Sequence, residues 1–302
     1  MANNPWRLLI TLILAFFITA CDQSSNNATG SGASAAQSQI NDKFTAFIKA
    51  ANSESSVNFY SLPEAFYHYQ RETEPQLTAG KTLTSYAVIN PSIFHTINEW
   101  LAKGLSLPGA LPQLDNAARA YQASIDKLLP LSEKLYAYQQ NKGWLTDGGE
   151  LARRSDGEYV AAFSALLAQR DSFLKAISVA NSERIKIAYE NSPADSAEHY
   201  RNGMVYLSRQ TLHELSDDRT PADERKLNDE VATLEQLAAG WSKLIQQQDE
   251  QGCQNIIDTA NDYISVLHAA IMQQAQGEEV IEENIILPFN ALVHALNSHR
   301  NC

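Results

Sequence analysis

Two long amphipathic segments joined by a glycine-rich break constrain this chain more than any other feature of its sequence. In residues 114–140 and again in residues 155–191, large side chains recur every three or four positions, which is the spacing of one face of an α-helix. These positions are Leu114, Ala118, Tyr121, Ile125, Leu128 and Leu135 in the first segment, and Tyr159, Phe163, Leu166, Arg170, Phe173 and Ile177 in the second. Residues 141–154 carry glycine and aspartate breaks, so we expect the two helices to reverse direction there and to form a hairpin.

The rest of the chain predicts further helices packed against this hairpin. Alternation typical of a strand is confined to residues 82–89, and residues 72–90 are the least regular stretch, which favours a loop or a short strand. Pro130 and Pro288 lie inside helical patterns and should kink them; such a kink usually bends a helix around the core, and less often marks a ligand site. The predicted fold class is all-α: an elongated bundle of long kinked helices built on a central antiparallel helical hairpin.

Capping patterns predict where several of these helices begin. An oxygen-bearing side chain at the N-cap, proline at the first helical position and an acid in the first turn each favour initiation. Ser155 and Glu158 have the spacing of a capping box that would start the second arm of the hairpin. The other predicted starts are the caps Asn41 and Ser61, the pair Asn90-Pro91, and the phrases Ser192-Pro193 and Thr220-Pro221.

The amino-terminal residues resemble the leader of a bacterial lipoprotein. Residues 1–7 contain one basic residue, and residues 8–18 form an apolar-rich run, which is shorter than the roughly 20 residues of a bilayer span. The run ends at Ile18-Thr19-Ala20-Cys21, which is similar to the lipobox, a motif whose cysteine is acylated and becomes the new amino terminus. We therefore expect residues 1–20 to be a lipoprotein signal peptide and Cys21 to carry lipid. The alternative is an ordinary signal peptide whose cleavage site adjoins a cysteine.

The residues after Cys21 bear on localisation. Asp22, followed by Gln23, resembles the signal that retains lipoproteins of enteric bacteria in the inner membrane. Residues 22–39 contain no large apolar side chain, so they predict a flexible tether with a reach of roughly 25 Å. The expected location is the bacterial cell envelope, lipid-anchored with the body in the periplasm, and the inner membrane is favoured over the outer membrane.

The chain is acidic, with a formal net charge of −12. An acidic chain without a basic run is poorly suited to phosphate backbones, which argues against nucleic acid as a partner. The same charge disfavours electrostatic docking on anionic lipid, so membrane attachment has to come from the acyl chains. A neutral or basic surface is the partner that this acidity favours.

The three cysteines divide between two roles. With Cys21 carrying lipid, Cys253 and Cys302 remain as an even pair in an oxidising compartment, so we expect a disulfide between them. The alternative is two unpaired thiols, because a residue at the chain end can fray.

No motif predicts catalysis, a cofactor or a metal. The seven histidines are scattered, and the pairs His95/Glu99 and Glu64/His68 are expected to be contacts on a helix surface rather than ligand pairs. No nucleophile elbow or phosphate-binding glycine loop is present in the sequence. The adjacent acids Asp217-Asp218 and Glu282-Glu283 point to different helical faces and are expected to be solvated charge.

One aromatic-rich stretch is the candidate partner surface. It consists of Phe59, Tyr60, Phe66, Tyr67 and Tyr69, which are too many rings in too few turns for all of them to face inward. An exposed portion would contact a protein or a glycan. The alternative is that these rings serve core packing alone.

Several segments of the chain are similar to the YiiG-like bacterial lipoproteins. The resemblance rests on residues 114–121, on Leu128-Leu129-Pro130-Leu131, on Tyr136-Ala137-Tyr138 and on the spacing to Trp144, Asp147, Gly148, Gly149 and Leu151. It extends over about residues 43–245 of a helical domain at 40–302, whose C-terminal helical pair is expected at about 253–301. The resemblance implies a helical domain of unknown function and brings no catalytic residues with it.

Two functions remain open at this point. The first is a non-catalytic lipoprotein that binds another envelope component, an unidentified protein or glycan. The second is a periplasmic small-ligand-binding or hydrolytic protein with a pocket between helices, which would need convergent polar groups assembled by the tertiary fold.

Overall fold

The structure is a computed structural model, and it describes residues 31–53, 61–78, 81–215, 221–248, 251–278, 280–299 and 302. The chain divides into two compact units, unit 1 (Met1–Ala180) and unit 2 (Asn181–Cys302). Every regular element of the described residues is helical, which confirms the predicted all-α class. No helix among them is long and apolar enough to cross a bilayer.

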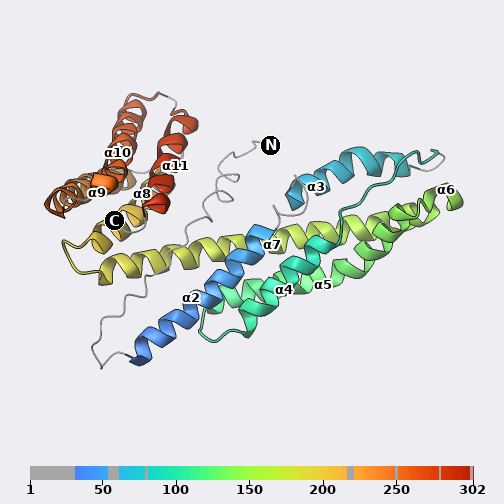
Figure 1. The fold of residues 1–302 in the computed structure, drawn as a ribbon. Helices are drawn as coiled ribbons and strands as arrows, with labels where there is room; N and C mark the ends of the chain where they lie inside the picture. Colours follow the sequence, from blue (N-terminus) through green and yellow to red (C-terminus); the bar gives the residue numbers. More distant parts are fainter. Residues whose placement is uncertain are drawn as a thin grey trace. The chain divides into compact units, whose positions relative to one another are not determined.

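The helices of unit 1 are drawn from blue to yellow-green in Figure 1. Between α3 and α4, a π-helix (Tyr69–Thr73) and a 3₁₀-helix (Glu74–Leu77) lead into an extended segment at residues 81–90. The α-helices are α2 (Ser31–Asn52), α3 (Leu62–His68), α4 (Ser92–Ser106), α5 (Pro112–Gln140), α6 (Trp144–Asp147) and α7 (Glu150–Asn191), the last of which continues into unit 2.

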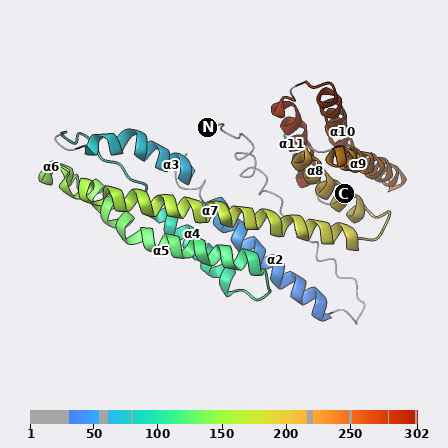
Figure 2. The ribbon, with the colours of Figure 1, turned by 180° about the vertical axis from the view of Figure 1, so that it is seen from behind.

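The predicted central hairpin is present as α5 and α7. The two helices lie side by side in both views, and the rings of Tyr121 and Phe173 join them at a centroid distance of 5.5 Å (Figures 1 and 2). The chain reverses through α6 and then through Gly148 and Gly149, whose φ angles are +65° and +89°. Glycine reaches such left-handed angles without the clash that a Cβ would cause, so this glycine pair permits the reversal.

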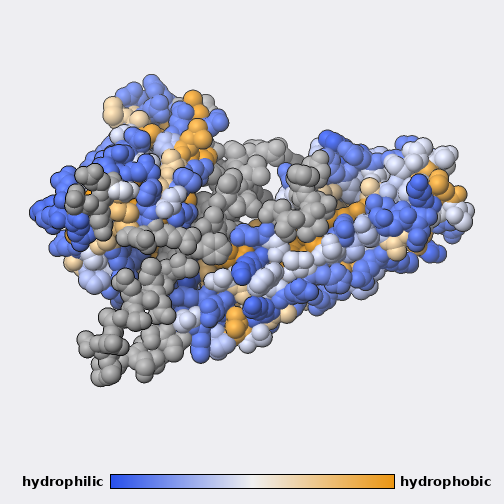
Figure 3. All heavy atoms as spheres, in the orientation of Figure 1, coloured by the Kyte–Doolittle hydropathy of each residue, from blue (hydrophilic) through white to orange (hydrophobic). Residues whose placement is uncertain are grey.

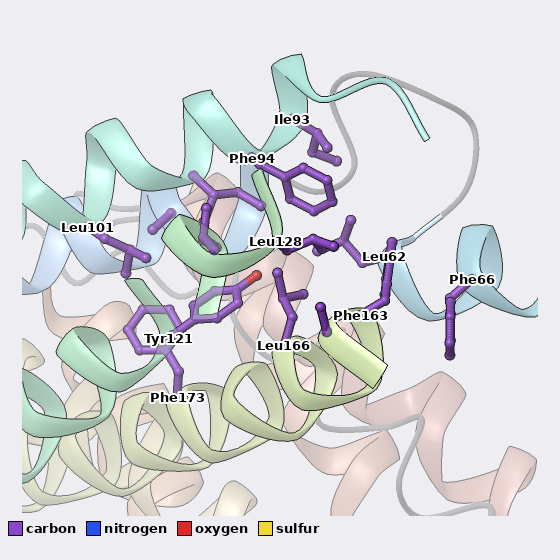
Figure 4. Packing of buried hydrophobic residues seen from close by; sticks show 14 of the residues in the cluster. Leu62, Phe66, Ile93, Phe94, Leu101, Tyr121, Leu128, Phe163, Leu166 and Phe173 are labelled. Atoms are coloured by element: carbon purple, nitrogen blue, oxygen red, sulfur yellow. The ribbon is translucent and has the colours of Figure 1, made fainter. Parts of the chain in front are cut away.

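The core of unit 1 is centred on aromatic rings of several helices (Figure 4). Phe163 of α7 stacks on Phe66 of α3 at 4.6 Å and meets the edges of Phe94 of α4 and Tyr159 of α7 at 5.9 and 5.7 Å. A pair of such rings stabilises a fold by about 0.5–1.5 kcal/mol beyond the burial of its area. The periodic residues of both hairpin arms therefore meet the rest of unit 1 at one centre.

A buried ion pair joins α2 to α5. The Nζ atom of Lys43 lies 2.9 Å from an Asp115 carboxylate oxygen and also donates to the Gly109 carbonyl at 2.9 Å. Both side chains are buried. Removal of one partner would leave a charge in the core without compensation, which costs far more than the pair itself contributes.

Unit 2 contains four further helices and the end of α7. They are α8 (Ala197–Glu214), α9 (Pro221–Gln248), α10 (Gln254–Ala275) and α11 (Glu282–Ser298), with a 3₁₀-helix (Gln251–Cys253) before α10. Contacts join α8 to α9, α9 to α10 and α10 to α11. Trp241 is the largest fully buried side chain, and Tyr263 meets Phe289 edge-on at 5.7 Å.

The disulfide Cys253–Cys302 closes unit 2 and confirms the predicted pairing. Its Cα atoms are 5.7 Å apart, and it joins residues separated by 49 positions in the chain. Arg201 of α8 also holds the chain end, because its guanidinium donates to the carbonyls of Leu296 and His299 at the end of α11.

Several predicted helix starts are wrong, and the structure gives the reason for each. Helix α2 begins at Ser31 rather than after Asn41, so residues 31–39, assigned to the tether, are helical. These residues include several alanines, the strongest helix former. Ser155 lies inside α7 and is buried, because that helix already begins at Glu150. Helix α8 is capped by Ser196, not started at Pro193, since Asp195 adopts φ +60°.

Of the other predicted boundaries, two helix starts are confirmed and the rest differ by a few residues. Ser61 caps α3 with a full capping box, and Pro221 is the first residue of α9, although Thr220 lies outside the described residues. Helix α4 continues two residues beyond the predicted stop at Gly104, and α11 starts at Glu282 rather than at 278. Residues 82–89 form no strand; the backbone of this segment bonds to the side chains of Thr73 and Gln139.

The aromatic–carboxylate end of unit 1 as a candidate functional site

Irregular backbone is concentrated at the end of unit 1 where α5 turns into α7. We call this region the hairpin end and define it as residues 69–78, 81–90 and 138–159. It contains the π-helix, the 3₁₀-helix, the extended segment and α6, together with Lys142 at φ +51°. Short π-helices and non-glycine residues at positive φ occur often at functional sites, which makes this region the candidate site.

Asp147 organises the turn itself. Its carboxylate accepts hydrogen bonds from the backbone N–H groups of Gly149 at 2.8 Å and Leu151 at 3.1 Å, and from the Tyr138 hydroxyl at 2.5 Å. Desolvation alone would raise the pKa of Asp147, but these hydrogen bonds outweigh it and hold the pKa below its usual value. Asp147 therefore caps the start of α7, the role that Ser155 was predicted to have.

Five aromatic rings from distant parts of the chain form the body of the site. Tyr69 meets Tyr159 at 4.9 Å, and Tyr86 meets Tyr138 at 5.5 Å. The indole of Trp144 lies 6.3 Å from Tyr86 and 6.4 Å from Tyr138. One ring contact thus joins the π-helix to α7, and the other three join the extended segment, α5 and α6, so each irregular piece is held to an arm of the hairpin.

A second carboxylate, Asp156, faces the cluster. The Tyr69 hydroxyl donates to it at 2.6 Å, and burial together with this hydrogen bond raises the pKa of Tyr69 far above its ordinary value. Burial, and then the charge of Asp156, also raise the pKa of Tyr86; the nearby Tyr69 hydroxyl opposes this shift, but only weakly. Both tyrosines stay protonated at every physiological pH and can act as hydrogen-bond donors.

Three buried donor atoms at the hairpin end make no hydrogen bond with the described residues. They are the hydroxyl of Tyr86, the indole nitrogen of Trp144 and Nε of Arg153. The other guanidinium nitrogens of Arg153 donate to the carbonyls of Gly148 at 2.7 Å and Lys81 at 2.6 Å, and so hold the turn to the extended segment. These three atoms can only donate or donate most readily, so a molecule that pairs with them would have to supply acceptors.

The outer surface of this end exposes apolar and aromatic side chains. Leu145 on α6 is 70% exposed, and hydrophobic atoms lie over α6 in Figure 3. Tyr67 on α3 is 58% exposed, with the Arg71 guanidinium 5.4 Å from its ring centroid. A rigid base with an exposed leucine at its tip is suited to contact with another molecule.

The structure divides the predicted partner surface between core and solvent. Phe66 and Tyr69 are buried in the core of unit 1, as the packing alternative expected, whereas Tyr67 is exposed. Phe59 and Tyr60 lie outside the described residues. Tyr67 is therefore the member of this set that the structure leaves available for contact.

The remaining predicted site residues fall into two groups. Cys21, Asp22 and Gln23, the predicted lipidation and sorting residues, lie outside the described residues. In the pairs considered for metal, His95 contacts Glu133 at 2.9 Å rather than Glu99, and Glu64 accepts from the Ser61 backbone while His68 faces Glu72. Within the described ranges, no three His, Cys, Asp or Glu side chains are placed to hold a metal ion.

Sequence reasoning missed most of the cluster. Tyr86 looked like part of a loop, and Tyr138 and Tyr159 looked like positions of a helix face. The tyrosines that meet in the cluster are up to 90 residues apart in the chain. Helical periodicity relates only residues that are close in sequence, so it could not predict these contacts. The signal that could have found it is the density of Tyr and Trp on both sides of the Asp147-Gly148-Gly149 turn.

A comparison with known protein families finds a match over most of the chain. The family described as "Protein of unknown function (DUF3829)" matches residues 38–291. The chain belongs to this family. The match extends from α2 into α11, so it is wider than the resemblance over 43–245 and takes in most of the C-terminal helical pair. No curated protein and no solved structure matched the chain.

Proposed function

We propose that the protein is a YiiG-like, membrane-anchored lipoprotein that binds another component of the bacterial envelope and performs no catalysis. The observation that carries the proposal is the sequence Ile18-Thr19-Ala20-Cys21 at the end of a short apolar run. Acyl chains on Cys21 would attach the protein stably, because two chains hold where one is marginal. Asp22 and Gln23 favour retention at the periplasmic side of the inner membrane.

The exposed part of the hairpin end is the contact surface in this proposal. Leu145 stands on a turn that Asp147, Arg153 and the ring cluster hold rigid, so little conformational entropy would be lost on contact. Tethering near the bilayer raises the effective concentration of this surface toward envelope partners.

The experiment has two arms in living cells. In the first, Cys21→Ala is compared with the native chain by membrane fractionation and by mass spectrometry of the mature amino terminus. The native chain is expected to begin at an acylated Cys21 and to sediment with membranes, and the variant is expected to lose that association. Unchanged membrane association of the variant would contradict the anchor.

In the second arm, a photo-crosslinking amino acid replaces Leu145 or, as a matched control, Val179. Val179 is also an exposed apolar residue of unit 1, but it lies far along α7 from the hairpin end. The Leu145 position is expected to give a specific crosslinked product that the Val179 position does not. Equal products at both positions, or none, would remove the hairpin end as the contact surface.

The small-ligand function has one observation in its favour, the buried donors of Tyr86, Trp144 and Arg153. A bound acceptor-rich molecule would satisfy them. Native mass spectrometry of the purified protein tests this directly, and Tyr86→Phe is the matched variant because it removes one donor and keeps the ring. A co-purifying molecule that is lost in Tyr86→Phe would favour ligand binding over the binding of an envelope partner.

A further inference from the structure

Most of the net negative charge of the chain lies near its carboxyl end. Residues 244–299 contain eight Asp and Glu side chains and not one Lys or Arg. Unit 1 differs, because residues 31–180 carry 13 basic and 14 acidic side chains and are close to neutral. Residues 244–299 therefore contribute a net charge of −8 to the −12 of the whole chain.

Helix α11 also exposes apolar side chains on its outer face. Ile285, Phe289 and Leu292 are buried against the rest of unit 2, as expected of an amphipathic helix. On the opposite side, Leu287 is 63% exposed and Ala291 is exposed as well. No Asp, Glu, Lys or Arg occurs between residues 284 and 299, so the outward face lacks the charges that normally solvate a surface helix.

The exposed apolar surface continues at the start of α11. Ile281, the residue that precedes the helix, is 59% exposed, and hydrophobic atoms lie along α11 in Figure 3. Exposed acids flank this region at Glu278 and Glu283. The outward side of α11 thus exposes the apolar residues Ile281, Leu287 and Ala291 among uncharged polar residues such as Asn284 and Asn290, with the acids Glu278 and Glu283 at its start.

The negative charge beside this face distinguishes between three possible binding partners: an anionic bilayer, a second copy of the chain and a cationic helix. An anionic bilayer would be repelled by the exposed acids Glu278 and Glu283 and by the net negative charge of unit 2. A second copy of the chain would bring another Glu278 and Glu283 to the same face, and this like-charge contact costs free energy. A cationic helix with one apolar side satisfies both parts of the face, because its leucines can contact the exposed apolar residues and its lysines or arginines can contact the acids.

We infer that the outward face of α11, centred on Leu287 and Ile281 and rimmed by Glu278 and Glu283, docks a basic amphipathic helix of a partner protein. This inference rests on the proposed binding function and assigns a partner chemistry to a surface separate from the hairpin end. Apolar contact supplies affinity, and the acidic rim selects the sign of the partner and speeds its approach.

The test uses a defined probe. A labelled 18-residue peptide carries leucine at helical spacing on one face and lysine elsewhere, and its control has the same composition in scrambled order. The full-length protein as the cell matures it is titrated with each peptide, with neutral phosphatidylcholine nanodiscs supplied to hold any acyl chains and empty nanodiscs as background. The amphipathic peptide is expected to bind at least about tenfold tighter than the scrambled one, since only it presents its leucines on one face.

Matched variants localise the binding. Leu287→Gln is expected to weaken the amphipathic peptide by about tenfold, while Ile187→Gln, an exposed apolar residue of α7 in the same unit, leaves it unchanged. Glu283→Gln is expected to weaken binding and reduce its salt dependence, whereas the exposed Glu183→Gln does not. Circular dichroism and melting temperature verify that each variant is folded.

Three results would overturn the inference. Equal affinity of the two peptides would mean that charge alone binds them. Equal loss in Leu287→Gln and Ile187→Gln would place the contact elsewhere. A dimer of the free protein in light scattering that Leu287→Glu dissociates would assign the face to a second copy. None of these results bears on Leu145 crosslinking, so a failure here is distinguishable from a failure of the proposed function.

Discussion

Residues 31–180 carry 13 Lys and Arg side chains against 14 Asp and Glu, whereas residues 181–302 carry 9 against 20. The nearly neutral unit 1 is held by a buried ion pair and by rings that stack across four helices. The acidic unit 2 has a disulfide between its chain end and the start of α10. A surplus of 11 negative charges repels itself within a small fold, and a covalent link is unaffected by that repulsion.

The two units also differ in the kind of surface that they expose. Unit 1 exposes Leu145 beside a ring cluster that contains two carboxylates and a guanidinium, and unit 2 exposes Ile281 and Leu287 beside the acids Glu278 and Glu283.

The largest effect is expected for Phe163→Ala, which removes the ring at the centre of the unit 1 core. Loss of the contacts with Phe66, Phe94 and Tyr159 and the cavity left behind should cost up to about 5 kcal/mol of unfolding free energy. Hydrogen exchange measured by mass spectrometry should show the loss in α2, α4 and α5 and not in α10 and α11. Equal loss in α10 and α11 would contradict the division into two units.

The disulfide prediction addresses unit 2 in the same way. In the chain-entropy model, closure of a loop of 49 residues contributes about 4 kcal/mol. Cys302→Ser should lower the stability of α10 and α11 by about that amount, and reduction of the native protein should reproduce the effect. Unit 1 serves as the internal control in both experiments, since its described residues contain no cysteine. No change in α10 exchange would show that the link does not stabilise unit 2.

The third prediction concerns the buried ion pair of unit 1. Lys43→Met leaves the Asp115 carboxylate buried without its partner and should cost about 3 kcal/mol. The double variant Lys43→Met/Asp115→Leu should recover most of this loss, because it removes the uncompensated charge as well. A double variant no more stable than the single one would mean that packing, and not charge, explains the cost.

The smallest effect is expected at the turn, and it depends on pH. Asp147→Ala removes the cap of α7 and should cost about 1 kcal/mol at pH 7. Since the folded pKa of Asp147 lies below its ordinary value of 3.8, the contribution of the carboxylate is present above that value and is lost as pH falls through the lower folded pKa. Native and variant stabilities should therefore converge in acid.

Glu158→Ala is the control for this measurement. Glu158 is an exposed acid on the same helix and would matter only if the capping box with Ser155 existed. Its substitution should change the unfolding free energy by less than about 0.5 kcal/mol at every pH. A Glu158 effect larger than that of Asp147 would restore the start of α7 predicted from the sequence.

Local sequence determined the helices and the hairpin. Side-chain periodicity is a property of neighbours along the chain, so residues 114–140 and 155–191 were identified as helices, and the glycines between them as a reversal. The disulfide could be predicted because the assignment of Cys21 to lipid left two cysteines. Local patterns can still mislead. Ser155 has the spacing of a capping box, but Asp147, which accepts from the Tyr138 hydroxyl, caps α7 at a start that lies before Ser155.

Only the tertiary structure decided which surfaces are free and which residues make the hairpin end. The aromatic residues Phe66, Tyr67 and Tyr69 have the same character in the sequence, yet packing against Phe163 and Tyr159 buries the first and third and leaves Tyr67 in solvent. Burial depends on contacts between segments far apart in the chain, and no local pattern records them. The net negative charge of residues 244–299 can be counted in the sequence. Which apolar residues of α11 are exposed beside these acids depends on the side of the helix that faces solvent, and the packing of Ile285, Phe289 and Leu292 sets that side.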